Sequence, residues 1–149
     1  MATRGFEYAY RIDGGQGGPK VVDWPLALID ANIGDALTID ASGYGTAVAT
    51  DTAEVLGILQ EDTGGLIATA GTKFKVALAC REHVFKCSMD ATTTTAVVGY
   101  TKDIQFVDGN TIDADGATSG ARILVDTGTD DAVNVLAYVV FEDTVFGNT

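Results

Sequence analysis

Short β-prone runs bounded by glycine and aspartate turns recur along this chain, and residues 32–62 show the pattern most clearly. Gly34-Asp35 predicts a turn, residues 36–39 (ALTI) predict a short strand, and residues 40–43 (DASG) predict a second turn. Residues 55–59 (VLGIL) are the next strand candidate. Gly57 in that run lacks a side chain, which indicates that another backbone or a tight bend comes close to it.

The same pattern continues outside this stretch and predicts an all-β fold. Eighteen glycines and only two prolines suit many short strands joined by tight turns. The other strand candidates are residues 20–24, 26–29, 73–79, 84–87, 104–107, 111–113, 122–126 and 133–141. About ten short strands predict a small β-sandwich or β-barrel, jelly-roll-like, with both arrangements left open. A chain of 149 residues is most simply one such domain, here residues 20–149.

Residues 1–19 differ from this domain and are expected to form an extended N-terminal arm with a glycine-rich hinge. Phe6, Tyr8 and Tyr10 alternate with other residues, as in a strand with one aromatic face. Residues 13–19 (DGGQGGP) are typical of a flexible hinge. Two interpretations remain open. The segment is an edge strand of the chain's own sheet or an arm that adds to the sheet edge or groove of a partner, with plain disorder as a minor alternative.

The acidic balance of the chain limits its partners. The formal net charge is −12, whereas nucleic-acid contact needs clustered lysine and arginine. The same charge disfavours an anionic membrane surface. It favours solubility, or steering toward a basic partner. The sequence also lacks a recognisable signal peptide and an apolar run long enough to span a membrane, so we expect a protein made in the cytosol.

No constellation of residues predicts catalysis, a metal site or a cofactor. His83 is the only histidine, and no nucleophile and acid are expected beside it. Cys80 and Cys87 with a single histidine do not make a zinc site, and we expect both thiols to be reduced and packed, with a disulfide as the alternative. The aspartates at 108–115 lack the distal glutamate of a calcium loop and are explained by turns. The chain is therefore not expected to be an enzyme.

Three segments resemble tailed-bacteriophage capsid decoration, or cement, proteins. These are residues 34–40 (GDALTID), 55–59 (VLGIL) and 74–78 (FKVAL), and the resemblance covers roughly residues 28–80. It implies a non-enzymatic virion protein that assembles in the host cytoplasm and sits on the capsid exterior. It also implies that the major capsid protein and further copies of the chain, as a homotrimer, are its partners.

From this resemblance and the aromatic pattern we predict which residues make contacts. Phe6, Tyr8, Tyr10 and Arg11 are the predicted capsid-contact residues of the arm. Trp24, the only tryptophan, is expected to be a core or rim anchor and, with Phe146, a subunit contact. Loss of the first twelve residues is expected to leave the fold intact and abolish shell binding.

Two alternative functions remain. One is another minor virion subunit, such as a head-fibre base or a tail protein. The other is a carbohydrate-binding β-sandwich, which we disfavour because the aromatic residues are few and lie mostly inside strand candidates.

Overall fold

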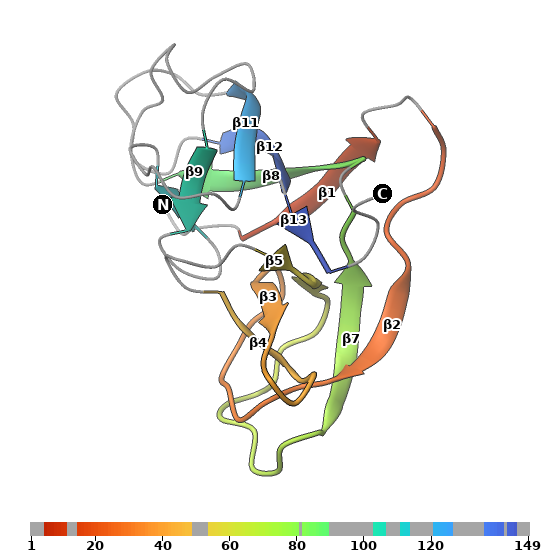
Figure 1. The fold of residues 1–149 in the computed structure, drawn as a ribbon, viewed down its shortest axis with the longest axis vertical. Helices are drawn as coiled ribbons and strands as arrows, with labels where there is room; N and C mark the ends of the chain where they lie inside the picture. The colour runs from red at the N-terminus through yellow and green to blue at the C-terminus, as the bar shows by residue number, and fades with distance from the viewer. Residues whose placement is uncertain are drawn as a thin grey trace.

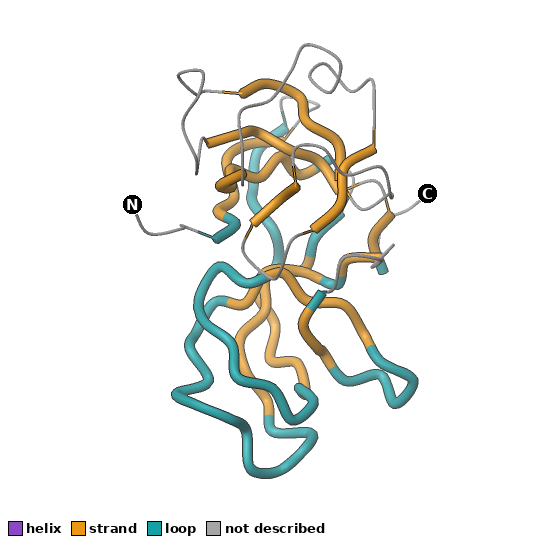
Figure 2. The backbone as a smooth tube through the Cα atoms, turned by 90° about the vertical axis from the view of Figure 1, so that its left-hand side faces the viewer, coloured by secondary structure: helices purple, strands orange, loops and turns teal. Residues whose placement is uncertain are grey.

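The protein is all-β, as the sequence predicts, with most of its strands in two sheets packed in a sandwich-like arrangement and two short strands in a separate small sheet (Figures 1 and 2). The structure is a computed structural model that describes residues 5–11, 15–48, 54–80, 82–89, 103–106, 111–113, 121–126, 136–141 and 143–145. No helix occurs among these residues. The strands are β1 (Glu7–Arg11), β2 (Val21–Pro25), β3 (Ala36–Ile39), β4 (Gly45–Ala47), β5 (Glu54–Val55), β6 (Gly57–Leu59), β7 (Lys73–Leu78), β8 (His83–Met89), β9 (Asp103–Phe106), β10 (Thr111–Asp113), β11 (Ala121–Asp126), β12 (Leu136–Phe141) and β13 (Asp143–Thr144).

The two sheets are joined through β7 and β8, which follow each other in the chain. The five-stranded sheet has the order β2-β7-β6-β3-β4, and the six-stranded sheet has the order β1-β8-β10-β9-β11-β12 with a further pairing of β8 with β12. β2 pairs antiparallel with β7, and β1 pairs antiparallel with β8. The first two strands therefore form the edges of the two sheets at the place where the sheets meet.

The five-stranded sheet buries side chains on both of its faces. One cluster between the sheets includes Ala36 and Ile58 together with Phe85 of β8. A second cluster contains Leu37, Leu59 and neighbouring loop residues. Because successive strand residues point to opposite faces, the adjacent pairs Ala36/Leu37 and Ile58/Leu59 each supply both clusters. This double burial explains why the run at residues 55–59 is continuously apolar.

Gly57 lies where the backbones of β6 and β7 come close, as the sequence predicts. It is paired with Leu78 and lies next to the Ile58–Ala77 pair. A Cβ atom added to Gly57 would overlap the carbonyl oxygen of Ala77. No other residue fits there, because every other amino acid carries that atom.

The two turns that bound β3 are closed by aspartate side chains. Asp35 Oδ2 accepts a hydrogen bond from the Asn32 N–H at 3.0 Å. Asp40 Oδ1 accepts from the N–H groups of Ser42 at 2.8 Å and Tyr44 at 3.0 Å. These are the side-chain-to-backbone bonds for which aspartate is favoured in turns, and they confirm both predicted turns.

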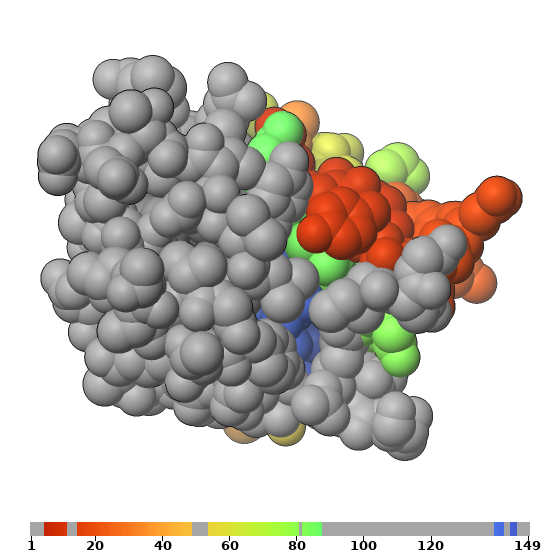
Figure 3. Space-filling model, turned by 90° about the horizontal axis from the view of Figure 1, so that it is seen from above, coloured from red at the N-terminus to blue at the C-terminus, as the bar shows by residue number. Residues whose placement is uncertain are grey.

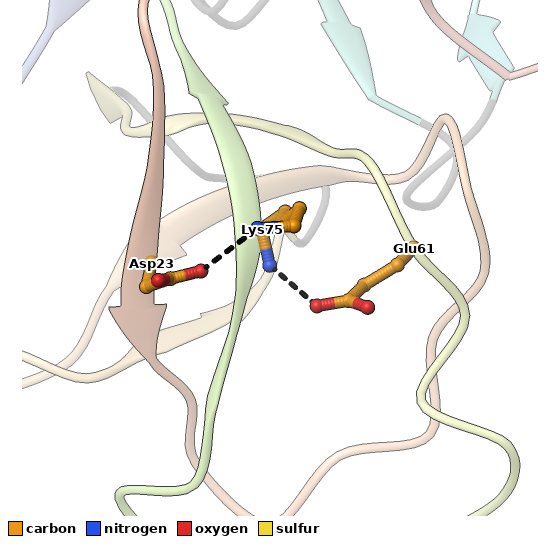
Figure 4. Close-up of polar contacts among 3 residues, drawn as sticks. All are labelled: Asp23, Glu61 and Lys75. Carbon is orange, nitrogen blue, oxygen red and sulfur yellow. Dashed lines mark hydrogen bonds and ion pairs between the residues drawn. The ribbon is translucent and has the colours of Figure 1, made fainter.

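The beginning of β7 is held on both sides by acidic residues (Figure 4). The Lys75 N–H donates to Glu61 Oε1 at 2.8 Å, and Lys75 Nζ lies 3.4 Å from Asp23 Oδ1 of β2. The ion pair is exposed and contributes little, about 0–1 kcal/mol. The backbone bond matters more, because it satisfies an N–H of β7 just beyond the end of β6.

Within the predicted arm, residues 7–11 form an edge strand of the chain's own sheet. β1 pairs with β8 from Glu7–Lys86 to Arg11–His83. Phe6, just before it, is 2 % exposed, and its ring lies 5.3 Å from that of Phe141. Its N–H donates to the Gly34 carbonyl at 2.7 Å. Phe6 is therefore a core residue of this chain, and its predicted capsid contact stays a prediction.

Two further expectations differ from the structure. Residues 26–29, a strand candidate, form a loop in which Leu26 makes a single bridge with Gly45. In β1 the register shifts between Tyr8 and Tyr10, which face Phe85 and Val84 respectively. Neighbouring residues of β8 point to opposite faces, so this β-bulge ends the single aromatic face after Tyr8.

The Gly57–Ala77 contact makes Gly57→Ala strongly destabilising. We expect a loss of about 3 kcal/mol in the free energy of unfolding, because the added methyl group meets backbone that cannot move without separating β6 from β7. Gly17→Ala is the matched control, since a Cβ there meets nothing within 4 Å and faces only a positive φ of 90°. It should cost about 1–2 kcal/mol. Urea unfolding of both variants measures the difference, and equal losses would contradict the proposed backbone contact.

Removal of the Phe6 ring should also destabilise the fold. Phe6→Ala leaves a cavity beside Phe141 and is expected to cost about 3–5 kcal/mol. Tyr10→Ala, on the same strand but 44 % exposed, should cost about 1 kcal/mol. Thermal unfolding compares the two. Because Phe6 packs in the core, deletion of the first twelve residues is expected to lower the melting temperature, and an unchanged melting temperature after the deletion would show Phe6 to be no part of the core.

Candidate functional site

A hollow of about 250 Å³ opens where the two sheets meet. Its floor includes Phe6, Ala77 and Phe85, all of which are buried. Its mouth is formed by exposed parts of Tyr8, Val21 and Ile33. The remaining lining residues are Glu7, Pro19 and Gln60. The hollow is thus the open end of the core between the sheets, which makes it the candidate interaction site.

Ile33 is held at the mouth by the turn that precedes β3. Its N–H donates to Asp62 Oδ1 at 2.7 Å, and Gly34 beside it has a φ of 94°. The Gly34 N–H donates to the Leu59 carbonyl at 2.9 Å. The backbone on both sides of Ile33 is therefore fixed, while 58 % of the Ile33 residue surface stays exposed. An apolar side chain held in place in this way loses little conformational freedom on binding.

The polar side chains of the hollow already have partners within the chain. Gln60 Nε2 donates to the carbonyls of Ile58 at 3.2 Å and Leu59 at 3.4 Å. The Tyr8 hydroxyl donates to the Gly17 carbonyl at 3.3 Å, and Glu7 lies 3.7 Å from Lys86 Nζ. The hollow therefore offers apolar contact from its floor and mouth beside polar groups that have partners within the chain, which suits an aliphatic or aromatic side chain.

The predicted arm residues have different surroundings. Tyr8 and Tyr10 are partly exposed, Arg11 is half-buried and Phe6 lies in the core. The Tyr8 ring lies edge-on to His83 at 5.4 Å and to Phe85 at 6.0 Å. Figure 3 shows the N-terminal residues, in red and orange, on the surface of the molecule. Tyr8 and Tyr10 therefore lie partly exposed along the edge of the sheet.

Trp24 is a rim residue of the second core cluster, as the sequence predicts. It packs against that cluster from β2 opposite Phe74, and its Nε1–H donates to the Gly43 carbonyl at 3.1 Å. This bond satisfies the indole donor while the ring stays only half-buried. Its predicted role as a subunit contact stays a prediction, and Phe146 lies outside the described residues.

Cys80 lies after β7, and His83 is the first residue of β8; hydrogen bonds join the two residues. The Cys80 N–H donates to His83 Nδ1 at 3.3 Å, and the His83 N–H donates to the Cys80 carbonyl at 3.1 Å. Burial, followed by the hydrogen bond with Glu82, raises the pKa of the Cys80 thiol. A raised pKa leaves less thiolate at neutral pH, which is the opposite of an activated nucleophile. The two hydrogen bonds between His83 and Cys80 give this histidine a structural role, which is to hold the connection between β7 and β8.

Both cysteine thiols are free, and Cys87 is buried in the core between the sheets. This matches the first of the two sequence expectations, reduced and packed thiols. Burial raises the pKa of the Cys87 thiol strongly.

Within the part of the chain that the structure describes, no group of three or more histidine, cysteine, aspartate or glutamate side chains is placed to hold a metal ion. Among the same residues, no helix has the length and apolar character needed to cross a membrane.

Of the residues that line the hollow, only Phe6 and Tyr8 were predicted as contact residues from the sequence. Val21 and Ile33 lie in β-prone or apolar surroundings and read as core residues, yet both are exposed. Their exposure depends on how β2 and the turn before β3 sit against β1, and no local pattern reports that arrangement.

Comparisons with known proteins identify no relative: no protein-family model, no curated protein and no solved structure matches the chain.

The different burial of the two thiols predicts different reactivity. Cys80 should react slowly with a thiol reagent at pH 7, and faster as the pH approaches its raised pKa, because thiolate is the reacting form. Cys87 should react only when the protein unfolds. Mass spectrometry of labelled peptides across pH 7–10 distinguishes the two sites. Rapid labelling of Cys87 in the folded protein would contradict its placement in the core.

Proposed function

We propose that this chain is a non-enzymatic virion structural protein that binds the exterior of a tailed-phage capsid and bridges neighbouring capsid subunits. The sequence resemblance over roughly residues 28–80 supports the class of protein. Copies of the chain are joined to one another in this proposal, so that many modest contacts act together by avidity.

The edge strand β1 is the observation that carries the proposal. Among the described strands β1 pairs only with β8, so no described strand lies along its other edge. It carries two partly exposed tyrosines, Tyr8 and Tyr10. An edge strand with exposed aromatic residues suits a partner that adds a strand of its own, with backbone bonds for affinity and rings for specificity. In this proposal β1 meets the major capsid protein.

The large negative charge fits the same role. A chain of net charge −12 does not adsorb readily to nucleic acid and stays soluble at high copy number. The capsid surface that receives it is then expected to be neutral or basic.

Sedimentation with capsids tests the proposal. Empty, expanded heads of the virus that encodes the chain, stripped of decoration, are mixed with wild-type protein and pelleted, and the bound copies are counted. Tyr10→Asp places a charge on the edge of β1 and should lower the apparent affinity at least tenfold. Ser42→Asp adds the same charge at an exposed turn of the other sheet and should bind as the wild type does.

Folding of both variants is checked by circular dichroism before the capsid experiment. No binding of the wild-type chain to any form of the head would exclude the proposed function. Equal binding of wild type and Tyr10→Asp would remove β1 as the contact strand.

A further inference from the structure

A second exposed apolar surface lies on two neighbouring loops of the five-stranded sheet. Leu66 is 71 % exposed and Leu28 is 55 % exposed. Their loops are joined because the Ile67 N–H donates to the Ile29 carbonyl at 3.0 Å and the Gly71 N–H to the Leu26 carbonyl at 2.8 Å. The loops of this sheet lie at the end of the molecule away from the six-stranded sheet (Figures 1 and 2). We call residues 26–29 and 63–72 the loop tip.

The loop tip is held in one shape by hydrogen bonds. The Thr63 N–H donates to the Ala31 carbonyl at 3.0 Å, and Thr63 Oγ1 accepts from the Ala31 N–H at 3.0 Å. The Thr63 hydroxyl also lies 2.8 Å from the Gly65 carbonyl, to which it donates. Leu66 therefore projects from an ordered loop, and its burial against a partner would cost little loop entropy.

The loop tip is uncharged although the chain is strongly acidic. Residues 63–72 (TGGLIATAGT) and 26–29 (LALI) contain no ionisable side chain, whereas the whole chain has a net charge of −12. Two copies of such a chain repel each other at short range, and this repulsion is weakest where the touching surfaces carry few unpaired charges. A surface that binds a basic partner is expected to carry acidic side chains, and the loop tip carries none. The absence of charge therefore favours a second copy of this acidic chain as the partner of the loop tip.

The hollow has the complementary properties. It is concave, has a volume of about 250 Å³, and is floored by apolar side chains with exposed apolar residues at its mouth. Its three polar side chains, Glu7, Tyr8 and Gln60, have partners within the chain. It therefore suits one or two aliphatic side chains and gives no preference to a charged group.

We propose that the loop tip of one copy, led by Leu66, inserts into the hollow of the next copy. This contact joins two different surfaces, so each copy offers one tip and one hollow, and repetition closes into a ring when the rotation between copies allows it. The inference rests on the part of the proposed function in which copies are joined to one another, and it does not involve the capsid.

A complementation experiment tests the contact. Leu66→Asp alters only the tip and Ile33→Asp alters only the mouth of the hollow, and both positions are exposed. Ser42→Asp is the charge control outside both surfaces. Light scattering coupled to size-exclusion chromatography gives the mass of each protein at several concentrations, after circular dichroism has shown that each is folded.

We expect wild type and Ser42→Asp to form the same closed oligomer. Each of the other two variants should associate at least tenfold more weakly and elute as a monomer. An equimolar mixture of these two variants should form a dimer, because the intact hollow of Leu66→Asp accepts the intact tip of Ile33→Asp. Added salt should strengthen the wild-type oligomer, since it screens repulsion between acidic bodies and leaves apolar contact in place.

Three results would overturn the inference: a monomeric wild type at every concentration, an oligomer that survives either substitution, or a mixture that stays monomeric. The hollow shares Glu7 and Tyr8 with β1, but none of these results measures capsid binding, so capsid sedimentation by the wild type would still support the proposed function. Conversely, the expected dimer without capsid binding would retain the contact between copies and exclude the capsid role.

Discussion

The burial of Phe6 between the two sheets is the contact on which the rest of this structure depends. Its ring packs near Phe141, and its N–H is bonded to the Gly34 carbonyl. The chain enters through Gly5, whose φ is 70° and where a Cβ would lie 2.9 Å from the Gly34 oxygen. Gly5 and Phe6, which precede β1, therefore attach the N-terminal segment to the turn that leads into β3. The placement of β1 beside β8, and with it the wall of the hollow, follows from this attachment.

Local features of the fold could be predicted from the sequence because local physics determines them. Asp35 and Asp40 close turns with their own side chains, and β3 has the same limits, residues 36–39, that its flanking turns predict. The glycine at position 57 predicts a close backbone approach, and the backbone of Ala77 lies there in the structure. The strand candidates at residues 104–107 and 111–113 are seen as the antiparallel pair β9–β10, with the residues between them outside the described part of the chain.

The features that depend on distant pairing could not be predicted in this way. The aromatic alternation at residues 6–10 fits an edge strand and a free arm equally well. Only the pairing of β1 with β8 shows that residues 7–11 form an edge strand. The shift of register after Tyr8 has no sequence signal, and residues 26–29 are as apolar as a strand although they form a loop. The hollow combines residues from Phe6 to Phe85, and exposed Ile33 and Leu66 resemble core residues in any local window. Its chemistry emerges only when the sheets are placed together.

Hydrogen exchange at the Phe6 amide tests the central claim, that the N-terminal segment is part of the folded core, most directly. In this account that amide is bonded to Gly34 in a buried position, so its exchange should be slowed nearly as much as that of the Leu59 amide, which donates to the Asp35 carbonyl. Nuclear magnetic resonance resolves both amides in the same sample. Exchange of Phe6 at the rate of an unfolded peptide, with Leu59 protected, would mean that the segment is a free arm, and the hollow would lose its floor and one wall.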